Sequence, residues 1–173
     1  MVNTDYKIEA LTVLLDKSCL AERYYPLIPY QKALLRALPL LGCRTKSDAE
    51  KLPDEAFAEI GFSDTGMLRL FRRFLTIYDP NPAKLREIPK VTPDPEEQAA
   101  FRELYYLPGV KAVRASLYYR AGFRSLSDFA EATPEAVLSR TAQAIAAYSL
   151  SCIVPLPKEV RTHIAVAKAF LWE

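Results

Sequence analysis

The sequence is poor in cysteine and histidine and has no long hydrophobic run, and each scarcity excludes a class of protein. Among its 173 residues are three cysteines, an odd number without a CxxC pair, which argues against a disulfide framework and a zinc ribbon. A single histidine, His163, excludes a metal site built from two histidines. Charged residues interrupt the N-terminal segment, so we expect neither a signal peptide nor a membrane-spanning helix there. These features favour a reducing, cytoplasmic location and no membrane partner.

An excess of charge of one sign is also missing. Lys and Arg together number 23 and Asp and Glu 21, which leaves a net charge of +2. A protein that binds a polyanion over its whole surface would carry a larger positive excess. Hydrophobic residues make up 50% of the chain and charged residues 25%, which is the balance of an ordinary globular protein.

Proline is present but unevenly distributed, and it divides the chain. Five of the 13 prolines fall between Pro80 and Pro95, where no helical period is visible. Because proline removes amide donors and fixes the backbone, this stretch predicts a semi-rigid connector at 79–95. In the flanking segments, 1–78 and 96–173, apolar residues recur at spacings of three and four. The sequence therefore predicts an all-α protein with two helical units.

The two halves share a segment of sequence at an offset of 80 residues. GCRTKSDAEKLPDEAF, from Gly42, aligns without gaps with GFRSLSDFAEATPEAV, from Gly122, and the two are identical at six of 16 positions. Such self-similarity predicts two copies of one supersecondary unit. The identical pairs are Gly42 and Gly122, Arg44 and Arg124, Ser47 and Ser127, Asp48 and Asp128, Glu55 and Glu135, and Ala56 and Ala136.

Helix start and stop signals recur within the repeated segment. Gly122 follows a helical pattern and can end it in a left-handed conformation without strain. Ser125 stands three residues before Asp128, which is the spacing of a capping box. Thr133 then precedes a proline and an acidic residue, the usual order at a helix start. The glycine and the capping box recur 80 positions earlier, so each copy is expected to contain short helices joined by tight turns.

The helix before each glycine is expected to bury one stripe of residues against the core. The carboxylates of the repeat lie at helix starts, so we interpret them as helix caps rather than catalytic groups. Cys43, which aligns with Phe123, is expected to be a small core residue. The predicted stripes are Val110, Val113, Leu117 and Ala121 in the second copy and Tyr30, Ala33, Ala37 and Leu41 in the first.

Residues 107–138, LPGVKAVRASLYYRAGFRSLSDFAEATPEAVL, resemble a tandem helix-hairpin-helix unit. The likeness lies in an apolar residue before a Pro-Gly-Val turn, a helix with a small buried residue, and an AGF-type turn into the next helix. It is closest to bacterial proteins built from paired, degenerate helix-hairpin-helix units, and it implies a SAM-like all-α fold. The resemblance extends to the N-terminal copy only because that copy is similar to residues 122–137 through the internal repeat.

The resemblance also implies a phosphate site. In nucleic-acid-binding members of that superfamily, amides of the hairpin and of the following helix N-terminus hold a backbone phosphate, as unpaired amides at a helix start generally do. Pro108, Gly109 and Val110 match the hairpin, whereas Lys111 stands at its second glycine. The lysine either obstructs a phosphate or attracts it with its charge. In the first copy IPYQ, residues 28–31, replaces the hairpin, and we expect no phosphate site there.

Basic residues near the hairpin leave two interpretations open. The stretch 104–127 contains four basic residues and no acidic one, with tyrosines between them, a pattern that suits a polyanion with stacking bases. By the helical period Lys111 and Arg114 share a face, whereas Arg120 lies nearly opposite. Lys111 and Arg114 therefore either contact phosphate or form a solvated helix face.

A second basic cluster, with the same two interpretations, consists of Arg69, Arg72 and Arg73, of which Arg72 and Arg73 are the candidate site residues. They lie in MLRLFRRFL, where Leu68, Phe71 and Leu75 are expected to form a core stripe. The arginines are then either further phosphate contacts or the solvated side of that helix.

Catalytic chemistry has little basis in the residue pattern. The sequence contains no GxxxxGK[ST], GxGxxG or GxSxG motif. His163 falls in an amphipathic pattern with Val160, Ile164 and Ala167, where a lone histidine is expected at the surface or boundary. We expect no enzyme, no cofactor and no metal.

Two functions from different classes are consistent with the sequence. The first is a non-enzymatic protein that binds nucleic acid, DNA in the first instance, through phosphate contacts at 108–114 without reading the bases. The second is a helical scaffold whose hairpins serve a protein partner or self-association. Loss of the hairpin glycines from the first copy favours the second function.

Overall fold

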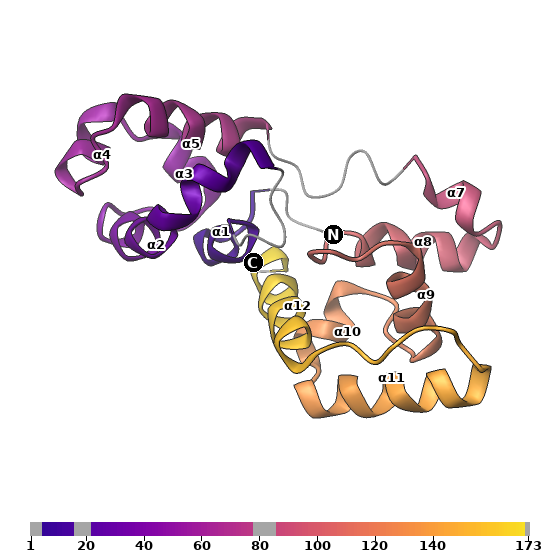
Figure 1. The fold of residues 1–173 in the computed structure, drawn as a ribbon. Helices are drawn as coiled ribbons and strands as arrows, with labels where there is room; N and C mark the ends of the chain where they lie inside the picture. The colour runs from indigo at the N-terminus through magenta and orange to yellow at the C-terminus, as the bar shows by residue number, and fades with distance from the viewer. Residues whose placement is uncertain (1–4, 16–21, 78–85, 172–173) are drawn as a thin grey trace. The chain divides into compact units, whose positions relative to one another are not determined.

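The computed structural model describes residues 5–15, 22–77 and 86–171 (Figure 1). This part of the chain contains eleven α-helices and one 3-10 helix, and its only extended pairing is a single antiparallel bridge between Lys7 and Thr45. The predicted all-α class is confirmed. The helices group into two compact units, an N-terminal unit of residues 3–79 and a C-terminal unit of residues 80–171.

The N-terminal unit is built around aromatic side chains. Phe57 and Phe71 pack edge to face with ring centroids 5.8 Å apart, and Tyr24 packs in the same way on Phe74. Cys43 is buried, as predicted. The helices of this unit are α1 (Ile8–Leu14), η1 (Glu22–Tyr30), α2 (Gln31–Leu40), α3 (Lys46–Lys51), α4 (Asp54–Glu59) and α5 (Thr65–Ile77).

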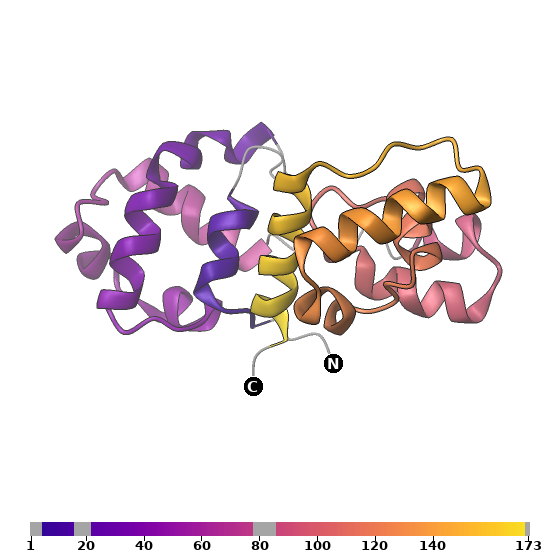
Figure 2. The ribbon, with the colours of Figure 1, turned by 90° about the horizontal axis from the view of Figure 1, so that it is seen from below.

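The C-terminal unit ends in a helix, α12, that packs against α10 and α11 (Figure 2). Its core includes Tyr118, Phe123 and Phe129, and the rings of Tyr118 and Phe129 have centroids 4.7 Å apart. The helices are α7 (Ile88–Val91), α8 (Pro95–Leu104), α9 (Ala112–Arg120), α10 (Leu126–Glu131), α11 (Pro134–Tyr148) and α12 (Pro157–Phe170).

Part of the predicted connector at 79–95 is helical, although no helical period is visible in its sequence. The short helix α7 lies within it, and α8 begins at its last residue. Pro89 and Pro95 lie in the first turns of these two helices, where a missing amide breaks no intrahelical hydrogen bond. In the described part of this stretch, proline therefore marks helix starts. Residues 78–85 lie outside the described residues.

The two glycine turns adopt the predicted left-handed conformation. Gly42 has φ of 81° and Gly122 has φ of 84°. In each turn the amide of the next residue donates back into the preceding helix, from Cys43 to Leu38 at 3.0 Å and from Phe123 to the carbonyl of Tyr118 at 2.9 Å. Glycine is the residue that takes this conformation without a steric cost.

Both predicted capping boxes are present. The Asp48 carboxylate accepts the Thr45 amide at 3.0 Å, and the Asp128 carboxylate accepts the Ser125 amide at 2.9 Å. The first and last residues of α10 lie 80 positions after those of α3, and the first residue of α11 lies 80 positions after that of α4. The copies then diverge, because α4 ends at Glu59 whereas α11 continues to Tyr148. Duplication of a whole unit stays a prediction.

The predicted core stripes of α2 and α9 are partly wrong. Val113 is 68% exposed and Ala33 is also exposed, whereas Leu34 and Leu38 are the buried residues of α2. In the second copy Val110, Leu117 and Ala121 are buried as predicted, and only Val113 is not. In the first copy none of the four predicted residues is buried, because the buried face of α2 lies one position further along the helix, at Leu34 and Leu38.

Candidate functional site

The turn between α8 and α9 is anchored by two buried apolar side chains. Leu107 and Val110 are fully buried, and the Val110 amide donates to the Leu107 carbonyl at 3.2 Å. Between them Gly109 is exposed and has φ of 73°, a conformation that residues with a Cβ rarely adopt. The glycine therefore reverses the chain on the protein surface just before α9 begins.

Helix α9 starts without a side-chain cap. Its N-cap residue, Lys111, has an extended backbone (φ −125°, ψ −174°) and makes no capping hydrogen bond, and the first turn contains no acidic residue. In contrast, α8, α10 and α11 are capped by Asp94, Ser125 and Thr133. First-turn amides have no intrahelical acceptor, and they lie at the positive end of the helix dipole. Together with the exposed Lys111 they form an electropositive helix start.

His163 of α12 holds this turn from inside. Its Nε2 lies 2.8 Å from the Pro108 carbonyl oxygen, and its Nδ1 lies 2.9 Å from the Tyr118 hydroxyl. Because a carbonyl only accepts, Nε2 carries the proton and Nδ1 accepts from the tyrosine. Burial lowers the pKa of His163 to about 4, so the ring is neutral near pH 7.

The expectation that His163 lies at the surface or boundary is wrong, since its exposed fraction is 1%. A sequence signal could have corrected it. His163 is three residues after Val160 and four before Ala167, both buried, so it belongs to the core stripe of α12. A histidine in such a stripe needs buried hydrogen-bond partners, which Pro108 and Tyr118 provide.

Arg114, at the third position of α9, is already paired. Its Nε lies 3.0 Å from Oε1 of Glu159, and its Nη1 donates to the carbonyl of Ile153 at 2.9 Å. The side chain is 20% exposed. It therefore forms neither a solvated helix face nor an open phosphate ligand in this structure, but ties α9 to the loop before α12.

Arg72 has a comparable role in the N-terminal unit. It forms a salt bridge with Asp54 at 2.6 Å, donates to the Leu52 carbonyl at 2.6 Å, and lies over the Phe57 ring. Its guanidinium thus joins α5 to the turn between α3 and α4. Its neighbour Arg73 is exposed, on the side of α5 opposite the predicted and now confirmed core stripe.

The candidate site residues therefore fall in two places. Pro108, Gly109, Val110, Lys111 and Arg114 are brought together in the C-terminal unit around the start of α9. Arg72 and Arg73 belong to the N-terminal unit.

An open groove of about 340 Å³ runs beside the first half of α9. Nearby side chains leave apolar surface open to solvent, with Val113 at 68%, Ile153 at 75% and Leu156 at 66% exposed. The groove is lined by Ala112, Val113, Ser116, Leu117, Leu150, Ser151 and Cys152.

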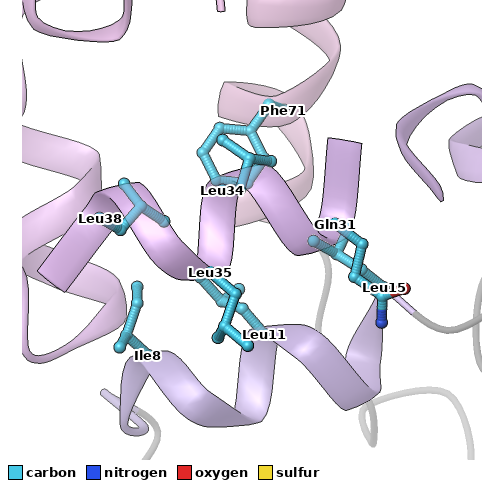
Figure 3. Close-up of a pocket in the computed structure, with 8 residues that line it drawn as sticks. All are labelled: Ile8, Leu11, Leu15, Gln31, Leu34, Leu35, Leu38 and Phe71. Atoms are coloured by element: carbon cyan, nitrogen blue, oxygen red, sulfur yellow. The ribbon is translucent and has the colours of Figure 1, made fainter. Parts of the chain in front are cut away.

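A much smaller cavity, of about 10 Å³, lies among α1, α2 and α5 in the N-terminal unit (Figure 3). Its lining is apolar except for Gln31, and its volume is about that of one water probe. It is a packing gap rather than a ligand site. The lining residues are Ile8, Leu11, Leu15, Gln31, Leu34, Leu35, Leu38 and Phe71.

Neither a metal site nor a membrane span is found in the described ranges. Within them, no group of three or more His, Cys, Asp or Glu side chains is placed to hold a metal ion. None of the helices described combines the length and the apolar character that a membrane crossing requires. In comparisons with known proteins, the chain matches no family model, no curated protein and no solved structure.

Proposed function

We propose that the protein is a non-enzymatic nucleic-acid-binding protein that holds backbone phosphate at the start of α9. The observation that carries the proposal is the absence of any side-chain cap on α9 immediately after the left-handed Gly109. A helix start of this kind attracts anions through its amides and its dipole. The exposed ammonium of Lys111 adds a full positive charge at the same place.

The chemistry of this site favours binding without base specificity. Backbone amides and a lysine recognise phosphate oxygens, and such contacts position a protein on nucleic acid without reading its sequence. The net charge of +2 agrees with a local contact rather than an extended basic surface. Arg114 adds to the site only when it leaves Glu159.

The test is binding of a fluorescein-labelled DNA duplex, and of its single strand, to the full chain in a salt series followed by anisotropy. We expect the affinity to fall steeply with salt, and Lys111→Ala to reduce the slope of log K against log salt by about 0.9, one phosphate contact. Lys90→Ala, an exposed lysine on α7, is the matched control and is expected to leave the slope unchanged. Absence of binding at low salt contradicts the proposal.

A second candidate function, a protein-interaction module, is favoured by one observation. The groove beside α9 is lined mainly by apolar side chains, one of them the exposed Val113, and the exposed Ile153 directly follows Cys152 of its lining. A chain that binds neither duplex nor single strand, and whose mass increases with concentration, favours this alternative. Val113→Ser with Ile153→Ser is then expected to lower the apparent mass.

A further inference from the structure

Helix α12 reaches the proposed phosphate site with two side chains one helical turn apart. Glu159 and His163 are four residues apart, so they lie on the same face of α12. Glu159 binds Arg114 of α9, and His163 binds the Pro108 carbonyl of the hairpin. The site is therefore controlled by an element outside the 108–114 segment.

His163 fixes the orientation of the hairpin. The imidazole is neutral, donates to Pro108 and accepts from Tyr118, so both ring nitrogens are used. This contact draws the Pro108 carbonyl toward the core, while the next residue, Gly109, stays on the surface.

Glu159 forms a salt bridge with Arg114, the basic residue in the first turn of α9. Two nitrogens of Arg114 face its two carboxylate oxygens, at 3.0 Å and 3.4 Å, and the third donates to the Ile153 carbonyl. All three guanidinium nitrogens are thus engaged before any ligand arrives. Three of the five N–H donors of Arg114 are used in these contacts, so a phosphate at α9 gains the paired contact that Glu159 now holds only by displacing this carboxylate.

We propose that α12 sets the phosphate affinity of this site, with His163 as the positioning residue of the hairpin and Glu159 as an internal competitor for Arg114. The proposal rests on the function proposed above. It predicts effects of opposite sign on binding: loss of His163 weakens binding, and neutralisation of Glu159 strengthens it. A purely structural role of α12 predicts no gain from either substitution.

The first arm of the experiment measures duplex binding by Glu159→Gln. Glutamine still accepts the Leu156 amide that caps α12, so the helix start is kept. We expect roughly tenfold tighter binding and a salt slope steeper by about 0.9, because Arg114 becomes available to a phosphate. Glu96→Gln is the matched control, since it removes the same charge from the Arg124–Glu96 pair of the same unit.

The second arm repeats Glu159→Gln in the Arg114→Ala background. The gain is expected to vanish there, because a competitor has no effect once its cation is removed. If wild type binds DNA but Glu159→Gln tightens binding no more than Glu96→Gln, or tightens it equally without Arg114, the competitor role is overturned while the proposed function stands. If no variant binds DNA at low salt, the proposed function and this inference both fail.

The third arm compares His163→Leu with His163→Gln. Leucine removes both hydrogen bonds and is expected to weaken duplex binding by roughly tenfold. Glutamine can donate to Pro108 and accept from Tyr118, and it is expected to restore binding. If His163→Leu does not fold, Tyr118→Phe removes one bond of the same relay and is expected to weaken binding less. Wild-type affinity in a folded His163→Leu overturns the positioning role.

Discussion

The chain enters α2 in the N-terminal unit and α9 in the C-terminal unit by different backbone conformations. In the N-terminal unit the 3-10 helix η1 runs into α2 through Tyr30, whose backbone is helical at φ −89° and ψ −10°. In the C-terminal unit Gly109 reverses the chain, and Lys111 enters α9 from an extended conformation. Downstream of these helices, both units have the same glycine turn and the same capping box.

This difference shows how one residue decides whether a helix start is accessible. Where a helical segment precedes the helix, the chain continues along a similar path over the first turn. Where glycine reverses the chain, the first-turn amides face away from the incoming segment. The C-terminal unit therefore presents an electropositive helix start that its N-terminal counterpart replaces with continuous helix.

Two half-buried arginines, Arg72 and Arg114, make similar contacts in the two units. Each of them binds one carboxylate and one backbone carbonyl. Arg72 binds the Asp54 carboxylate and the Leu52 carbonyl, and Arg114 binds the Glu159 carboxylate and the Ile153 carbonyl. Basic residues in an amphipathic helix are here structural ties between segments. The two helix starts beside these arginines differ in charge, because the first turn of α4 contains Asp54 and Glu55 whereas the first turn of α9 contains no acidic residue.

The largest expected loss of stability comes from removing the contact that only the C-terminal hairpin has. His163→Ala leaves the Pro108 carbonyl and the Tyr118 hydroxyl without their partner and opens a cavity in the core. We expect the free energy of unfolding to fall by about 2 to 4 kcal/mol. Denaturant unfolding followed by far-UV circular dichroism measures it. A loss below that of Ser125→Ala would contradict the assigned importance of this contact.

The same histidine predicts a pH dependence of stability. Its pKa is about 4 in the folded protein because burial disfavours the charged ring, against about 6.5 when unfolded. The unfolded state therefore takes up the proton first, and stability is lost as the pH falls from about 6.5 toward about 4. His163→Gln, which does not titrate, is expected to show a smaller loss over this interval in denaturant unfolding. An equal loss in both proteins would exclude His163 as its source.

The glycine turns provide a matched test of how alike the two units are. Gly42→Ala and Gly122→Ala both place a Cβ at a positive φ, and each is expected to cost about 1 to 2 kcal/mol. The added Cβ at position 122 also meets the Arg140 guanidinium, whereas nothing lies within 4 Å at position 42. The loss at 122 is therefore expected to be equal or slightly larger, as measured by urea unfolding. A much smaller loss at either glycine would contradict the shared turn.

The smallest expected difference concerns the caps. Thr45→Ala and Ser125→Ala each remove the side-chain acceptor of a capping box. Each is expected to destabilise the protein by about 1 kcal/mol, with similar values for the two. Thermal unfolding of the two variants side by side measures this. Clearly unequal losses of stability would show that the two capping boxes, although alike in sequence, have different structural environments.

Local chemistry explains which features could be predicted from sequence. A left-handed glycine and a capping box depend on a few neighbouring residues, so Gly42, Gly122 and the caps at Thr45 and Ser125 were predictable. The all-α class followed from apolar spacing for the same reason. The short helix α7 is not predicted by composition, because proline breaks the interior of a helix but suits its first turn.

Features that depend on distant segments were not predictable. Arg114 pairs with Glu159, 45 residues away, and the sequence around Arg114 does not predict this partner. A family resemblance and the basic cluster predict the hairpin residues, whereas the sequence pattern leads to the wrong expectation that His163, which holds the hairpin, lies at the surface or boundary. Its place in the apolar stripe of α12 was visible, but its partners at Pro108 and Tyr118 come from tertiary packing.

The most direct test of the central claim is a titration of the ¹⁵N-labelled full chain with a DNA duplex, followed by amide chemical shifts. The comparison of the two units predicts shifts that increase with duplex at the amides of residues 109–114 and none at residues 29–34, where η1 passes into α2. Shifts at residues 29–34 in place of 109–114, or no shifts in either segment at low salt, would contradict it.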